Sequence, residues 1–198
     1  MILDAAQAVI FRNGLENTTM DDIAEEAELA KGTLYLYFKN KEIIQYEISK
    51  RGAGLLNDKI QNVIDPSRSG LENLVRIGWE FAEFATKERK FFNLFLFFHS
   101  IDLKAREIPR ENIEDYFLNH SPFKTLIDVI NSGINDGSIR GDLPVNDTAT
   151  ALWSTIMGLL VVQENKKEIY SIFKVNSKGI IQTSFEIILN GITGKKTN

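Results

Sequence analysis

The chain has 198 residues, enough for one domain or for a small domain and a larger one, and its 43% hydrophobic and 25% charged content is ordinary for a soluble protein. It contains no cysteine, so disulfides, thiolate metal sites and cysteine nucleophiles are excluded, and a reducing cytoplasm is expected. A net charge of −4 argues against a surface that is basic throughout but leaves room for a local basic patch.

The first helix is expected over residues 2–13, where apolar residues recur on one side and Gly14 follows as a C-cap. This N-terminus lacks the positive region of a signal peptide. The longest apolar run, Ala149–Val162, is interrupted by Thr, Ser and Gly, and it is judged too short and too polar to span a bilayer. We therefore expect a cytoplasmic protein with no membrane partner.

Residues 18–42 contain two short helical patterns separated by a turn. Thr19 and Asp22 form a Thr-x-x-Asp capping box at the start of the first pattern, and apolar residues then recur at helical spacing. In the second pattern Leu34 and Phe38 stand four apart and can face a core together. The remaining side chains of the second helix are then left on its outer face.

That outer face combines hydroxyl, aromatic and basic side chains: Thr33, Tyr35 and Tyr37 lie beside Lys31, Lys39 and Lys41. Residues 31–51 carry five Lys or Arg against two acidic residues, whereas residues 1–30 carry one against seven. A helix, a tight turn and a basic second helix are the layout of a DNA-binding helix-turn-helix. Exposed tyrosines also occur on ordinary helical bundles, so the interpretation depends on the whole combination.

The stretch from Ile2 to about Glu47 resembles the N-terminal domain of the tetracycline-repressor (TetR) family of bacterial transcription regulators. The matching residues are Ala5-Ala6, Phe11, Gly14, Thr18-Thr19-Met20, Ile23-Ala24, Ala27, Lys31-Gly32-Thr33-Leu34-Tyr35, Tyr37-Phe38 and Lys41-Glu42. Glu28 departs from the family, which usually has Gly in the turn, and Ala30 stands where Ser is frequent. A β-carbon at Glu28 is expected to strain the turn if the turn is left-handed there.

Position on the second helix, with the resemblance, predicts the DNA contacts. Thr33 and Tyr35 lie near the helix start and are expected to touch base edges in the major groove. Lys31 is expected at a guanine or a phosphate, and Tyr37 and Lys41 at phosphates. The full set of predicted contacts is Thr19, Lys31, Gly32, Thr33, Tyr35, Tyr37 and Lys41.

The remainder of the chain is expected to be helical. Lys41 to about Ile64 forms a long helix, in which Gly52 and Gly54 mark either a hinge or close packing. Further helices are expected at residues 71–86, 89–101, 109–118, 122–136, 145–163 and 177–192. The predicted fold is all-α, with a three-helix helix-turn-helix domain over residues 1–45 and a helical ligand-binding and dimerisation bundle over residues 46–198.

Aromatic residues are concentrated between residues 79 and 98, with later partners on another helix. Phenylalanines at helical spacing usually fill a core, so a solid core is the alternative to a pocket. The number of aromatics, and the pocket that the corresponding helices enclose in similar regulators, favour a cavity for a small apolar ligand. The predicted ligand contacts are Trp79, Phe84, Phe95, Phe98, Trp153 and Met157.

The last two long helices carry apolar stripes, which either pack within one chain or join two chains. A single helix-turn-helix covers one half-site, so two copies about a two-fold axis are needed for high affinity. We therefore predict, as the resemblance also implies, a homodimer through an intermolecular four-helix bundle. The predicted interface residues are Leu152, Ile156, Leu159, Leu160, Ile181, Phe185, Ile188 and Ile192.

Catalysis and metal binding have little support. His99 and His120 are the only histidines, and neither has the spacing of a metal or acid–base site. No enzyme activity, metal or cofactor is predicted.

The predicted function is a ligand-responsive transcriptional repressor, which binds a palindromic operator as a dimer and is released by a small apolar ligand. The alternative is a helix-turn-helix DNA-binding protein without a small-molecule switch.

Overall fold

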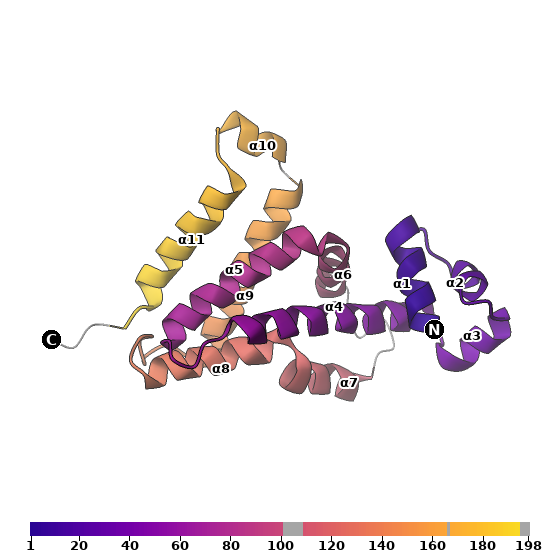
Figure 1. Ribbon diagram of the computed structural model, residues 1–198, viewed down its shortest axis with the longest axis horizontal. Coiled ribbons are helices and arrows are strands. Elements are labelled where there is room, and N and C mark those ends of the chain that lie inside the picture. The colour runs from indigo at the N-terminus through magenta and orange to yellow at the C-terminus, as the bar shows by residue number, and fades with distance from the viewer. Residues whose placement is uncertain (101–108, 166, 195–198) are drawn as a thin grey trace. The chain divides into compact units, whose positions relative to one another are not determined.

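The computed structural model describes residues 1–100, 109–165 and 167–194, and within them leaves out the side chains of residues 97–100, 120, 164, 165, 167–169 and 177. All regular elements in these ranges are helices, with one isolated antiparallel bridge between Ile139 and Thr193 (Figure 1). The predicted all-α class is thereby confirmed. The helices fall into two compact units: Met1–Leu55 with Glu88–His120, and Leu56–Lys87 with Ser121–Asn198.

The first unit begins with the predicted helix-turn-helix: α1 (Ile2–Asn13), α2 (Met20–Glu26) and α3 (Lys31–Tyr37). Thr19 caps α2, since its hydroxyl accepts from the Asp22 N–H while the Asp22 carboxylate accepts from the Thr19 hydroxyl and N–H. The hydrogen bond from the Thr19 hydroxyl, and after it the one from the Thr19 N–H, hold the pKa of the Asp22 carboxyl below its ordinary value. The predicted capping box is therefore confirmed, as is the C-cap at Gly14.

The core of this helix-turn-helix head recruits residues far along the chain. Leu34 is fully buried in it, and α4 (Lys41–Val63) adds Ile44 and Ile48. Leu94 of α6 (Arg89–Ser100) belongs to the same cluster, and Phe91 packs against its edge. The core of the head is thus completed by α6, which lies outside the 1–45 domain predicted from the sequence.

Gly52 explains how α6 approaches α4 within the first unit. A β-carbon at Gly52 would lie 2.8 Å from a ring carbon of Phe91, so the glycine makes room for that ring. Phe91 also meets Phe11 of α1 edge-on, with ring centroids 5.0 Å apart. Of the two roles considered for Gly52, the structure supports close packing. The unit ends with α7 (Arg110–Asp115) and the π-helical turn η2 (Tyr116–His120).

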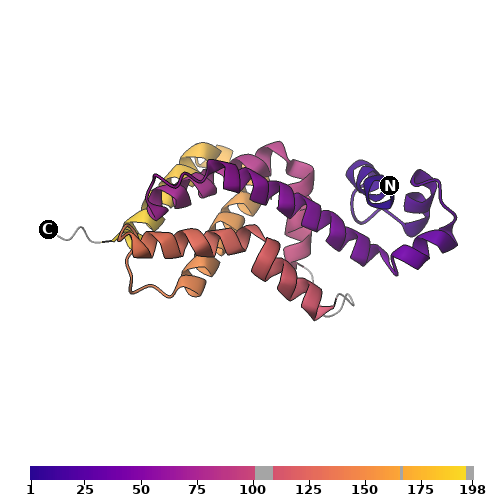
Figure 2. The same cartoon turned by 60° about the horizontal axis from the view of Figure 1, so that its bottom comes forward.

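The second unit is built on α5 (Gly70–Lys87), α8 (Pro122–Asn135) and α9 (Val145–Asn165), which pack side by side (Figures 1 and 2). Two further helices follow: α10 (Lys167–Ile172), which the sequence analysis did not predict, and α11 (Ser177–Ile192). In Figure 1, α10 lies at the top, beside the upper ends of α9 and α11. At its far end α11 is held by Arg140, whose N–H donates to the Ile192 carbonyl.

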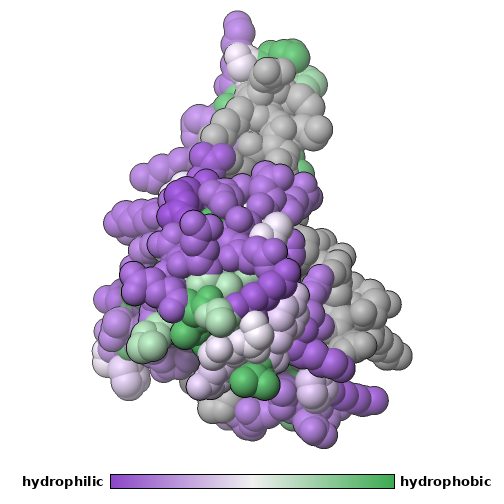
Figure 3. Space-filling view, turned by 90° about the vertical axis from the view of Figure 1, so that its right-hand side faces the viewer, coloured by the Kyte–Doolittle hydropathy of each residue, from purple (hydrophilic) through white to green (hydrophobic). Residues whose placement is uncertain are grey.

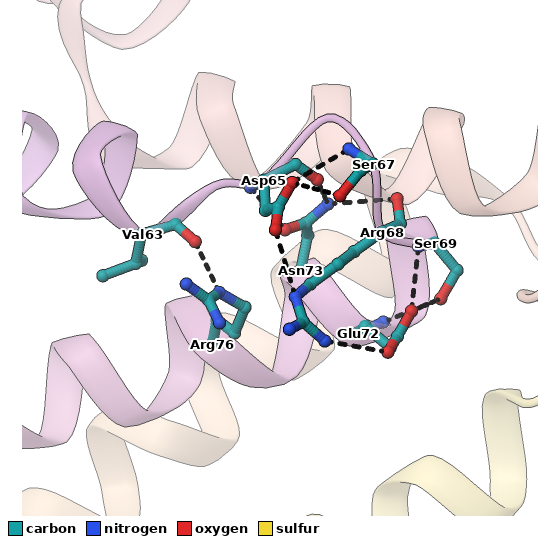
Figure 4. A network of polar contacts seen from close by, with 8 residues as sticks. All are labelled: Val63, Asp65, Ser67, Arg68, Ser69, Glu72, Asn73 and Arg76. Carbon is teal, nitrogen blue, oxygen red and sulfur yellow. Dashed lines mark hydrogen bonds and ion pairs between the residues drawn. The ribbon is translucent and has the colours of Figure 1, made fainter.

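A polar network fixes the corner between α4 and α5 (Figure 4). Asp65 accepts from the Ser67 N–H and hydroxyl, and the buried Asn73 side chain both donates to and accepts from the Asp65 backbone. Arg68 lies between the Asp65 and Glu72 carboxylates. The buried Asn73 amide thus has a hydrogen-bond partner for both its oxygen and its nitrogen, and these bonds hold the end of α4 against the start of α5.

Helix α9 extends beyond the apolar run visible in the sequence, and Val145–Gln163 has a mean hydropathy of 1.3, so by length and composition alone it could cross a membrane. The run Ala149–Val162 therefore understates the length of the apolar helix to which it belongs. Only 22% of that stretch is buried in the described structure, so much of a long apolar helix is left uncovered.

Candidate DNA-binding face and effector cavity

The outward side of α3 is the candidate DNA-binding face. Tyr35 is 45% and Tyr37 69% exposed, while Leu34 on the opposite side is fully buried. Gly32 is exposed with open space around it, and Thr33 is half-buried. Figure 3 faces the side on which Figure 1 draws α1–α3 and shows a mainly hydrophilic surface broken by small apolar areas. A surface of this kind can approach the polar groove of a duplex.

The two predicted lysines already have protein partners. The Lys31 ammonium lies 2.5 Å from an Asp21 carboxylate oxygen, and this hydrogen bond raises the pKa of Lys31. Lys41 donates to the Leu15 and Thr18 carbonyl oxygens at 3.2 and 2.8 Å. Lys41 therefore ties the start of α4 to the segment before α2, and one ammonium hydrogen remains for a phosphate. Its phosphate contact stays a prediction, as do those of exposed Thr19 and Lys31.

The turn between α2 and α3 is left-handed at Glu28, where φ is 54°. A β-carbon in this conformation costs about 1 kcal/mol, so Glu28→Gly is expected to raise the free energy of unfolding by somewhat less than about 1 kcal/mol, because glycine also adds entropy to the unfolded chain. The change also removes a negative charge beside α3, so affinity for operator DNA is expected to rise. Denaturant melts and DNA titrations measure the two effects.

Lys174 supplies the matched control, because it has φ 52° and lies in the second unit. Lys174→Gly relieves the same kind of strain without removing an acidic charge from the DNA-binding head. We expect it to raise stability but not operator affinity. Equal gains in affinity from both variants would contradict the electrostatic part of the prediction.

An apolar cavity of about 70 Å³ lies inside the second unit. Every residue that lines it is apolar, and α4, α5, α8, α9 and α11 all contribute: Ile60, Leu74, Val75, Ile77, Gly78, Phe81, Pro122, Leu126, Leu152, Trp153, Ile156, Leu159, Phe185, Ile188 and Leu189. Gly78 lets Phe185 close one wall, since a β-carbon there would lie 2.6 Å from the tip of that ring. Such a wall offers mainly contact to hydrocarbon, and the Trp153 indole N–H is the one side-chain hydrogen-bond donor among the lining residues.

The predicted ligand contacts coincide with this cavity only in part. Trp153 lines the cavity and stacks on Phe81 with ring centroids 5.1 Å apart, but Trp79, Phe84 and Met157 are not among the lining residues. Phe95 is buried in the first unit, and the Phe98 side chain lies outside the described residues. The cavity wall is mostly aliphatic, and the role of the other predicted residues as ligand contacts stays a prediction.

The predicted dimer residues are buried or partly buried within the single chain, and their place in a dimer interface stays a prediction. Leu160, Ile181 and Ile192 are buried within the chain. The other members of the predicted set line the cavity: Leu152, Ile156, Leu159, Phe185 and Ile188. A stripe of large apolar side chains marks a buried face, but helical periodicity does not say which chain buries it.

The outer faces of α9 and α11 carry different residues. On α9 the exposed positions include Ala151, Thr155, Gly158 and Val162, and on α11 Ile187 is 69% exposed. Gly158 in particular has open space where a β-carbon would lie. Gly158 is therefore no site for a substitution meant to fill the cavity, because a larger side chain there would enter open space.

No cluster of three or more His, Asp or Glu suited to a metal is found among the described residues. The His99 and His120 side chains, which the sequence analysis singled out, lie outside that description.

Comparison with known proteins places these features in a family. Residues 2–44 match the family described as "Bacterial regulatory proteins, tetR family". The repressor KstR2 of Mycobacterium tuberculosis is 30% identical over 145 residues, which are 73% of this chain and 70% of that protein. The chain belongs to the TetR family. The "Fatty acid metabolism regulator protein" of Bacillus subtilis is a TetR-family relative 26% identical over 98% of this chain and 95% of its own length.

Solved TetR-family structures share the fold. The regulator FadR of Bacillus subtilis, solved in complex with stearoyl-CoA, matches with a TM-score of 0.68 and 24% identity, covering 96% of this chain and 97% of that one. A TetR-family regulator from Shewanella matches with a TM-score of 0.71 and 16% identity over 98% and 97%. Family membership confirms the predicted function, a ligand-responsive DNA-binding transcriptional repressor, over a DNA-binding protein without a switch.

Proposed function

We propose that the protein is a homodimeric repressor of the bacterial cytoplasm that leaves a palindromic operator when a long-chain acyl-CoA places its hydrocarbon chain in the cavity of the second unit. The observation that carries this proposal is the cavity itself, whose lining residues are all apolar. No catalytic role is proposed, since the relatives are transcription regulators.

The shape of the ligand follows from the size of the cavity. At about 70 Å³ it is far below the roughly 300 Å³ of an ordinary ligand pocket, so the walls must separate on binding. A flexible acyl chain can enter segment by segment, whereas a rigid fused-ring ligand needs its full width at once. One relative that matches 98% of this chain is a fatty acid metabolism regulator, which favours the acyl chain.

A titration tests this proposal. Operator duplexes are first selected from a random library with the wild-type protein, and the dissociation constant is then measured with stearoyl-CoA, free stearate or free coenzyme A present. We expect stearoyl-CoA to weaken operator binding by a factor of about 5–150, the usual range of allosteric coupling, and coenzyme A to have no effect. Unchanged operator affinity with both stearoyl-CoA and stearate would overturn the acyl assignment.

The dimer is proposed through the outer faces of α9 and α11. A long apolar helix with 22% of its apolar stretch buried needs a cover, and a second copy also supplies the second half-site reader. The small residues Ala151, Thr155 and Gly158 would allow the α9 helices of two copies to approach closely, with Val162 and Ile187 adding apolar area.

Ile187→Glu is expected to convert the dimer to monomers. It places two like charges in a desolvated interface, and an unpaired buried charge costs several kcal/mol, so the dimer dissociation constant should rise by about a hundredfold or more. Sedimentation equilibrium measures this change. Leu118→Glu, at a 63% exposed leucine of the first unit, is the matched control and should leave the dimer intact.

Two covalent routes join the cavity to the DNA-binding head. Helix α4 contributes Ile60 to the cavity and Ile44 to the core of the head. Helix α5 lines the cavity and continues almost directly into α6, which places Leu94 in the same core. A ligand that moves α5 can therefore also move α6, which is part of the core of the head. It can alter operator affinity only if it binds the DNA-competent and DNA-incompetent states with different affinities.

A further inference from the structure

The side chain that projects most freely from α3 belongs to Leu36, which is absent from the DNA contacts predicted from the sequence. Leu36 is 85% exposed, compared with 45% for Tyr35. Successive residues of an α-helix are rotated by about 100°, so Leu36 and Gly32 lie together on the side opposite the buried Leu34. Because Gly32 has no side chain, Leu36 stands alone on the outermost ridge of the helix.

Leucine has no hydrogen-bond donor or acceptor, so it cannot read the polar edges of the bases. The apolar group that base pairs present in the major groove is the 5-methyl group of thymine. Contact with that methyl removes apolar surface of both partners from water. A phosphate or a cytosine edge offers Leu36 no comparable gain.

We propose that Leu36 is a base-reading residue that contacts a thymine methyl group in each operator half-site. The inference rests on the DNA-binding function and adds to it the chemical identity of one recognised base. It also assigns the centre of α3 to apolar readout, with Thr33 and Tyr35 as the neighbouring polar side chains on either side of the ridge.

The test removes the methyl group from the DNA and the side chain from the protein in one cycle. In a duplex selected with wild-type protein, each symmetry-related pair of thymines is replaced by uracil, which differs only by the missing methyl. We expect one pair to weaken wild-type binding by about fifteenfold, about fourfold for each half-site, the effect of roughly one buried methylene-sized group. Leu36→Ala should bind the thymine and uracil duplexes with equal affinity.

Leu118→Ala is the matched control, because Leu118 is 63% exposed in η2 and is not on α3; it should show the full wild-type preference for thymine. Thermal melts of Leu36→Ala are expected to match the wild type, since so exposed a side chain contributes little packing. The inference would be overturned if the wild type bound the thymine and uracil duplexes equally and Leu36→Ala lost the same affinity on both. Leu36 would then contact the sugar-phosphate backbone of the DNA and not a thymine methyl. Failure of the wild type to select any duplex would instead contradict the DNA-binding function.

Discussion

Leu94→Ala is expected to destabilise the DNA-binding head, although residue 94 lies far from the helix-turn-helix in sequence. Leu94 is buried in one core cluster with Leu34, Ile44 and Ile48. Replacing a fully packed leucine by alanine leaves a cavity and costs about 2–5 kcal/mol. The free energy of unfolding should fall by that amount, and operator binding should be lost at temperatures at which the wild type still binds.

Denaturant melts followed with a probe in the head, together with operator titrations over temperature, measure these effects. Asn93→Ala is the control on the same helix, because Asn93 is exposed and its replacement should change stability by no more than about 0.5 kcal/mol. A head that melts and binds DNA normally in Leu94→Ala would mean that residues 1–45 form an independent domain.

The helix-turn-helix could be predicted from the sequence because its determinants are local. The capping box at Thr19 depends on residues three apart, and the left-handed turn at Glu28 depends on a position that usually holds glycine. The burial of Leu34 follows from spacing within one short helix. None of these features requires knowledge of what packs against the helix from elsewhere.

The cavity and the outer face of the second unit could not be predicted in the same way. The stripe through Leu152, Ile156 and Leu159 predicts a buried face, but it lines a cavity within the chain, and the exposed side of α9 is made of smaller residues that give no strong periodic signal. Leu94 posed the same difficulty, because an apolar residue on an aromatic-rich helix gives no indication of which core it joins. Long-range partners are decided by tertiary packing, which a single sequence leaves open.

Val75→Phe is expected to make the repressor insensitive to its effector while leaving operator binding nearly intact. Val75 lies on α5 in the wall of the cavity, and exchange of its isopropyl group for a benzyl group fills much of a space of about 70 Å³. The acyl chain then has to displace a ring as well as separate the walls. Overpacking itself costs about 1–3 kcal/mol of stability, so a thermal melt must first show that the variant is folded.

The comparison uses stearoyl-CoA as the probe and the wild-type operator dissociation constant as the reference. In the wild type the probe should weaken operator binding by a factor of about 5–150, and in Val75→Phe this factor should fall to nearly one. Val175→Phe makes the same chemical change at a 43% exposed valine between α10 and α11 that is not among the lining residues, and it should respond like the wild type. If the folded Val75→Phe variant releases the operator at the same stearoyl-CoA concentration as the wild type, the effector does not occupy this cavity, and the route through α5 and α6 loses its starting point.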